Sequence, residues 1–168
     1  ETGIEFYAYS AEGCMIWFRS RVKMDQTASE EHGMDKGNMR IIDDLMFRHW
    51  DYWHDYAYSH VFTARVQGSK LTGIKDILEG EKFESPTAPW FDGAEVSWSP
   101  DGKYIAYTCK KLSGKEDAVS TNTDIYLYEL ASGETVNISE GMPGFDKFPV
   151  FSPDSRKIAW QSMEEAGY

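Results

Sequence analysis

The sequence contains little cysteine and no long apolar run. Cys14 and Cys109 are the two cysteines among 168 residues, and they form no Cys-x-x-Cys spacing, so neither a disulfide framework nor a zinc site is indicated. No stretch of about 18 apolar residues occurs, so no membrane span is predicted. The sequence begins at Glu1 without the charged and apolar regions of a signal peptide, so we expect any export signal to lie elsewhere.

Basic residues are also scarce. Lys and Arg number 17 against 28 Asp and Glu, which gives a formal net charge of −11 at pH 7. A surface that binds phosphate needs clustered Lys and Arg, so we predict no nucleic-acid partner. His49 and His54 are not at the i, i+4 spacing of a zinc-binding helix, and we predict no metal site and no cofactor.

Aromatic residues, in contrast, are abundant. They make up 15% of the chain, with 10 Tyr, 9 Phe and 6 Trp. Such residues favour pleated, half-buried strands over a helical bundle. The composition therefore predicts β structure.

A ten-residue segment occurs three times. Trp-Ser-Pro-Asp-Gly-Lys-Tyr-Ile-Ala-Tyr at 98–107 recurs as Phe-Ser-Pro-Asp-Ser-Arg-Lys-Ile-Ala-Trp at 151–160, and a more divergent copy lies at 9–18. In the middle copy, Ser99 suits the first position of a type I turn, Pro100 the second and Gly102 the fourth. After the turn, apolar residues alternate with period two. Each copy therefore predicts a β-hairpin.

A second repeat follows the first two hairpins. Residues 60–66 match residues 124–130, and residues 135–139 have the pattern of a fourth strand. Each unit is then a four-stranded antiparallel sheet, which is the blade of a β-propeller. We predict an all-β fold, a partial β-propeller of four-stranded antiparallel blades with one inserted loop and short helix.

The repeats also predict the organisation of the chain. Residues 1–94 form a first blade with an insertion at about 24–58, residues 95–147 a second blade, and residues 148–168 the first half of a third. Within the insertion, residues 24–37 are predicted to be an exposed loop, and residues 40–55 an amphipathic helix, because apolar residues recur there at three- and four-residue spacing. Two and a half blades cannot close a ring, so we expect a piece of a longer chain or a segment that self-associates.

These motifs resemble known families. Ser-Pro-Asp-Gly-Lys at 99–103 with Ile-Ala-Tyr at 105–107 is similar to the repeats of both TolB-like propellers and the prolyl oligopeptidase family. Residues 43–51, Asp-Asp-Leu-Met-Phe-Arg-His-Trp-Asp, and residues 120–126, Ser-Thr-Asn-Thr-Asp-Ile-Tyr, resemble the bacterial dipeptidyl peptidase and acylaminoacyl peptidase branch of the prolyl oligopeptidase family.

This resemblance implies a parent serine peptidase. Its N-terminal propeller would cap a C-terminal α/β-hydrolase domain, which would carry the whole catalytic triad and would be the propeller's partner in the same chain. The sequence agrees with the absence of a catalytic residue here, because no serine is flanked by glycine two residues before and two after, as a nucleophile elbow requires. The propeller would admit and help to bind a peptide substrate.

Five residues of the insertion are predicted to face the substrate. Family members can hold the substrate's amino group with paired propeller carboxylates, and Glu30 with Glu31 is such a pair, although the sequence around it does not match the family's helical motif. The alternative for this pair is a solvated loop. Arg48, Trp50 and Trp53 could face the peptide, with the arginine suited to a carboxylate or carbonyl. The alternative for these three is packing of the insertion against its own blade.

Two functions of different classes remain. The chain is predicted to be the non-catalytic propeller portion of a serine exopeptidase that hydrolyses short peptides, gating and helping to bind the substrate. The alternative is a TolB-like propeller scaffold that binds another protein and catalyses nothing. The sequence does not fix the cellular compartment, and the family resemblance alone would imply the periplasm.

Overall fold

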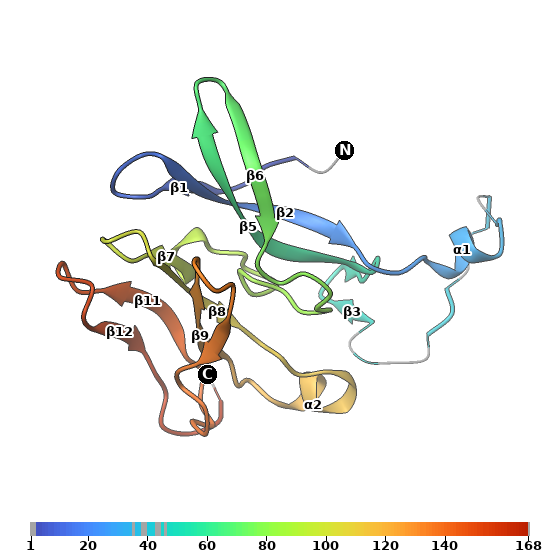
Figure 1. Cartoon of the computed structure of the whole chain (residues 1–168). Coiled ribbons are helices and arrows are strands. Elements are labelled where there is room, and N and C mark those ends of the chain that lie inside the picture. Colours follow the sequence, from blue (N-terminus) through green and yellow to red (C-terminus); the bar gives the residue numbers. More distant parts are fainter. Residues whose placement is uncertain (1–2, 35, 38–39, 43–44, 46, 168) are drawn as a thin grey trace.

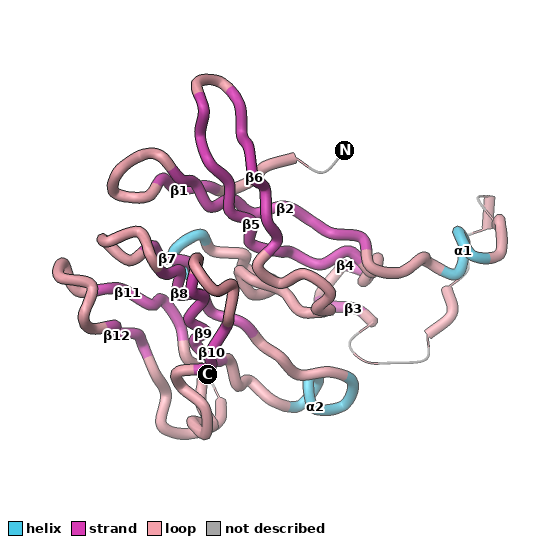
Figure 2. The backbone as a smooth tube through the Cα atoms, viewed as in Figure 1, coloured by secondary structure: helices cyan, strands magenta, loops and turns pink. Residues whose placement is uncertain are grey.

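The computed structural model describes residues 3–34, 36–37, 40–42, 45 and 47–167. Within these ranges the chain is built mainly of antiparallel strands with a few short helices (Figure 2). No helix of this described part is long and apolar enough to cross a membrane. The structure thus confirms the all-β class.

Two four-stranded antiparallel sheets form the body of the molecule (Figure 1). The first has the order β1-β2-β5-β6 and the second the order β10-β9-β8-β7. Their strands are β1 (Tyr7–Tyr9), β2 (Met15–Lys23), β5 (Ala57–Gln67), β6 (Lys70–Asp76), β7 (Val96–Trp98), β8 (Tyr104–Cys109), β9 (Asp124–Glu129) and β10 (Thr135–Asn137). The predicted four-stranded antiparallel units are confirmed, whereas their arrangement as propeller blades stays a prediction.

A third hairpin packs against the second sheet. Its strands are β11 (Lys147–Phe151) and β12 (Ile158–Gln161), and β11 contacts β7 and β8. The first two sheets meet along their first strands, because the indole Nε1 of Trp98 on β7 donates a hydrogen bond of 3.1 Å to the Ala8 carbonyl on β1. The first strands of the three units therefore lie next to one another in the order β1, β7, β11.

The repeated turn has the same hydrogen bonds in all three copies. The fourth residue of each turn donates its N–H to the carbonyl of the first and has a positive φ, as in the pairs Gly13–Ser10, Gly102–Ser99 and Ser155–Ser152. The first serine also accepts a backbone hydrogen bond on its hydroxyl, from the N–H of Met15, Tyr104 or Lys157. The sequence motif thus specifies a turn in which these hydrogen bonds are made by residues of the motif itself.

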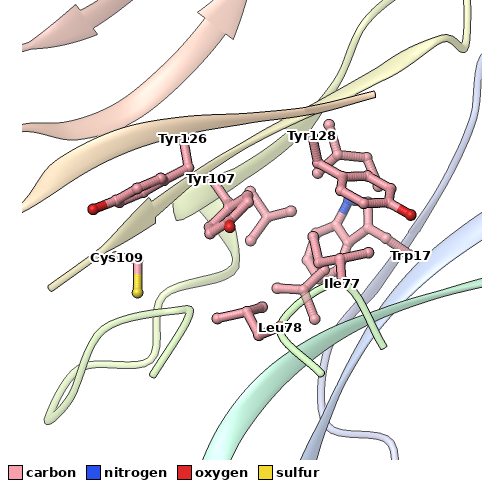
Figure 3. Close-up of a cluster of buried hydrophobic side chains, with 10 residues drawn as sticks. Trp17, Ile77, Leu78, Tyr107, Cys109, Tyr126 and Tyr128 are labelled. Carbon is pink, nitrogen blue, oxygen red and sulfur yellow. The ribbon is translucent and has the colours of Figure 1, made fainter. Parts of the chain in front are cut away.

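The hydrophobic core lies where the two sheets face each other (Figure 3). Trp17 and Val61 come from the first sheet, and Tyr107 and Tyr126, stacked with ring centroids 5.5 Å apart, come from the second. Leu78, in the connection after β6, is fully buried between them. Because side chains alternate along β2, the neighbours Ile16 and Phe18 form a smaller cluster with Ala64 on the other face of the first sheet.

The insertion differs from the prediction. The helix predicted over residues 40–55 is wrong, because β3 (Arg48–His49) and β4 (Tyr52–Trp53) form a hairpin that reverses at Trp50 and Asp51. Stacking of Phe47 on Trp53, with centroids 6.0 Å apart, accompanies this pairing. Asp43, Asp44 and Met46 of the predicted helix and of the family motif lie outside the described residues.

Three short helices occur in the described part of the chain. Helix α1 (Ala28–Glu31) lies in the segment predicted to be a loop. It begins with a capping box, in which Thr27 and Glu30 satisfy each other's backbone N–H groups. The 3-10 helix η1 (Gly93–Glu95) precedes β7, and α2 (Gly114–Val119) lies between β8 and β9 (Figure 1).

Candidate functional site

A groove of about 1010 Å³ lies at one end of the two sheets. Its walls are the ends of β2 and β5, the hairpin β3–β4, the connection around residues 82–91, and the segment that carries α2. Each of these is a connection or a strand end, so the residues of the groove can vary without changes to the sheets. Its position and size make it the candidate binding site.

A buried arginine forms part of the groove. Arg19 on β2 is 4% exposed, pairs with Glu5, and donates from Nε to the Ser59 hydroxyl at 2.6 Å. Its guanidinium also lies over the ring of Phe91, 4.2 Å from the centroid. Burial lowers the pKa of Arg19, while Glu5 and Glu84 favour its charge. Arg19 on β2 therefore joins the segment before β1 and strand β5 to the 82–91 connection.

A second arginine organises the start of β5. Arg21 donates to the Asp55 carboxylate at 2.6 Å and to the Ala57 carbonyl at 3.0 Å. Burial opposes the ionisation of Asp55, but the hydrogen bonds from Arg21 and from the Ala57 N–H outweigh it, and the pKa of Asp55 lies below its usual value. The two ends of the insertion, at β2 and β5, are thus held together by an ion pair.

Glu84 differs from these paired charges. This partly buried carboxyl lines the groove, and burial raises its pKa to about 7, although Arg21 and Arg19 act in the opposite direction. His54, which also lines the groove, has a lowered pKa, again because burial disfavours the charged form. The Nδ1 of His54 accepts the Tyr56 N–H at 3.1 Å. Burial thus favours the neutral form of both side chains, and Glu84 changes charge near pH 7.

Aromatic side chains gather at the hairpin. Trp53 lies under the guanidinium groups of Arg40 and Arg48, at 4.4 and 5.2 Å from the ring. Trp50 is 63% exposed and meets Trp90 edge to face, with centroids 5.2 Å apart. Large exposed aromatic faces beside a groove are typical of binding surfaces.

The structure brings together three of the five predicted site residues. Arg48 donates from Nε to the Trp50 carbonyl at 2.7 Å and covers Trp53, and both tryptophans line the groove. Glu30 and Glu31 lie on α1, and neither of them lines the groove. The Glu30 carboxylate accepts the Thr27 N–H at 2.6 Å and pairs with Lys23 at 3.0 Å, and these contacts lower its pKa to about 2.

Sequence reasoning missed Arg19, Glu84 and Trp90. For Arg19 the sequence held a signal. This arginine lies between the apolar residues 15–18 and the apolar residue 22 of one strand, and a charged side chain in such a place is expected to have a buried partner. Glu84 and Trp90 lie in a connection without periodicity, and only the packing of that connection brings Glu84 into the groove wall and Trp90 against Trp50. In the described ranges, no cluster of three or more His, Cys, Asp or Glu residues could hold a metal ion.

The comparisons with known proteins point to one class, the dipeptidyl peptidases. No family model matches the chain. Over 167 residues, 99% of its length, it is 44% identical to Dipeptidyl-peptidase 5 of Porphyromonas gingivalis and 43% identical to Dipeptidyl-peptidase 5 of Porphyromonas endodontalis. Over 146 residues it is 31% identical to Dipeptidyl-peptidase 5 of Aspergillus fumigatus.

The chain spans only part of these relatives. It covers 24% of the two bacterial proteins and 20% of the fungal one. The similarity supports the interpretation of the chain as a fragment of a dipeptidyl peptidase. This agrees with the resemblance to dipeptidyl peptidases found from the sequence. The particular relatives are all named Dipeptidyl-peptidase 5.

Proposed function

We propose that the chain is the non-catalytic propeller segment of a serine dipeptidyl peptidase. The single observation that carries the proposal is the identity of 44% to Dipeptidyl-peptidase 5 over 99% of the chain. Catalysis would be performed by a C-terminal α/β-hydrolase domain through acyl transfer to a serine. The segment described here would admit the peptide and bind part of it.

The packing of the three units supports a propeller. In this fold the first strand of each blade lies next to the central axis, and successive blades pack face to face. Strands β1, β7 and β11 lie side by side, and the first two sheets share one core. We propose blades at residues 1–94, 95–147 and 148–168, the last incomplete, with the insertion at about 24–58 as part of the first.

The groove supports a role in substrate binding. Its walls combine fixed ion pairs with exposed aromatic faces, which suits a peptide that needs both hydrogen bonds and apolar contact. We propose Arg48, Trp50 and Trp53 as the substrate-facing residues of the hairpin. Glu30 and Glu31 stay a prediction, and the Glu30 carboxylate would have to exchange its contacts with Thr27 and Lys23 for a substrate amine.

Release of a chromogenic group tests the proposal. A panel of dipeptide and acyl-amino-acid substrates is offered to the 168-residue chain and, in parallel, to the full-length product of its gene. We expect dipeptide release by the full-length protein, abolished by a serine-directed inhibitor, and none by the 168-residue chain. Activity in neither would contradict the proposal and favour the binding scaffold, while hydrolysis by the 168-residue chain would overturn the assignment of catalysis to another domain.

A further inference from the structure

Two tryptophans from distant parts of the sequence form a corner beside the groove. Trp50 is 63% exposed and Trp90 62% exposed, and their rings are inclined by 78°. Trp50 lines the groove, as do Pro89 and Phe91 on either side of Trp90. An edge-to-face pair leaves ring faces open to solvent, and these faces can cover a third apolar group.

The backbone holds Trp50 there at a cost in stability. It is the first of the two loop residues between the paired His49 and Tyr52, and its φ is 51°. Hairpin loops of this length usually carry glycine at such a position, because a side chain is strained at positive φ. Burial of the indole does not compensate for this strain, since most of its surface is exposed. Strained residues of this kind are concentrated at binding sites.

The charges nearby favour an uncharged ligand group at this corner. Arg19 pairs with Glu5, Arg21 with Asp55, and Lys110 with Asp117, all within the groove. Arg40 and Arg48 lie over Trp53, and Arg48 also donates from Nε to the Trp50 carbonyl, so both guanidinium groups already have partners on the hairpin. What the corner offers a ligand is apolar area, whose burial is favourable for any bulky apolar side chain.

We propose that Trp50 and Trp90 are specificity-determining residues that bind a bulky apolar side chain of the peptide. This inference rests on the proposed function, because it assigns the chemistry of the substrate to the same groove. It adds Trp90, which the sequence did not single out. The strain at Trp50 also allows an effect on binding to be distinguished from an effect on folding. Replacement of Trp50 by glycine should relieve the backbone strain and at the same time remove the ring that binds the ligand.

The first test compares Trp50→Gly and Trp90→Ala in the full-length protein, with Val136→Ala on β10, a similarly exposed apolar residue at 57%, as the matched control. Chromogenic dipeptides carry either a bulky apolar residue or alanine. We expect KM for the bulky substrates to rise about 10- to 100-fold in both tryptophan variants, with kcat and the alanine substrates nearly unchanged. The melting temperature of Trp50→Gly should stay equal or rise, which shows that the loss is not unfolding.

The second test measures binding directly, so that failure of the proposed function can be distinguished. A phenylalanine is moved through the four positions of an alanine tetrapeptide, and affinity is measured by titration calorimetry with the full-length protein and its variants. Wild-type hydrolysis with unchanged preference in both variants would overturn the inference and leave the proposed function intact. If the wild-type protein hydrolyses no dipeptide, the proposed function fails. In that case, phenylalanine-dependent binding that both variants lose would still support the assignment of Trp50 and Trp90 as binding residues. If the wild-type protein shows no such binding, or if both variants keep it, the assignment is refuted.

Discussion

Replacement of Glu84 by glutamine is expected to change how stability depends on pH. In the folded chain burial raises the pKa of this carboxyl to about 7, from an ordinary value of 4.5. A raised pKa means that the folded state prefers the protonated group. The contribution of Glu84 to stability is therefore fully present below about pH 4.5 and is lost as the pH rises through about 7.

The size of the effect follows from the two pKa values. At about 1.4 kcal/mol for each pKa unit, ionisation of Glu84 costs the folded state at most about 3 kcal/mol. Glutamine has nearly the same shape and does not titrate. Relative to Glu84→Gln, the wild-type chain should thus lose up to about 3 kcal/mol of unfolding free energy between roughly pH 4 and pH 8.

Urea denaturation followed by tryptophan fluorescence measures this difference at several pH values. Other titrating groups are common to both proteins and cancel in the comparison. Glu79→Gln removes an exposed carboxylate from the same stretch of chain and serves as the matched control. A difference between wild type and Glu84→Gln that does not change with pH would refute the reasoning, as would a carboxyl signal of Glu84 that titrates near its ordinary value in NMR.

Three further predictions concern stability and are measured by the same denaturation. Ser99→Ala should cost about 1–3 kcal/mol, because the fully buried hydroxyl is removed and the partly buried Tyr104 N–H loses its acceptor, and the same change at the more exposed Ser152 should cost less; equal losses would contradict this. Gly102→Ala should cost about 1–2 kcal/mol from its φ of 69° alone, since an added Cβ meets no atom within 4 Å. Lys147→Met should cost about 3–5 kcal/mol, because it leaves the fully buried Glu95 carboxylate without its cation, and Glu95→Gln in the same chain should restore part of the loss.

Much of the fold could be predicted because its information is local. The turn at Ser99 to Gly102 and the alternation of Ile105 and Tyr107 lie within ten residues of one another, and the repeat at 151–160 confirms their meaning. The same signals gave the four-stranded units and the place of the insertion between β2 and β5. Local backbone preference and burial point to the same structure in these segments.

The site could be predicted only in part because it depends on contacts between distant segments. The helix over 40–55 was inferred from spacing, but short-range pairing of Arg48 with Trp53 and of His49 with Tyr52 prevails. Trp50 was selected for its residue type and does line the groove, whereas its neighbour Trp90 lies 40 residues away in sequence. Periodicity carries no information about such a contact.

The insertion leaves and re-enters the first sheet at adjacent positions, because Lys23, the last residue of β2, is paired with Ala57, the first of β5. A chain segment whose two ends are already neighbours can be lengthened at small entropic cost, about 0.6 kcal/mol for each doubling of its length. The sheet therefore does not constrain the length or the sequence of the segment between Lys23 and Ala57. One scaffold can accept hairpins of different size and chemistry there, so that related proteins can exchange ligand preference through this one segment and keep every strand in register.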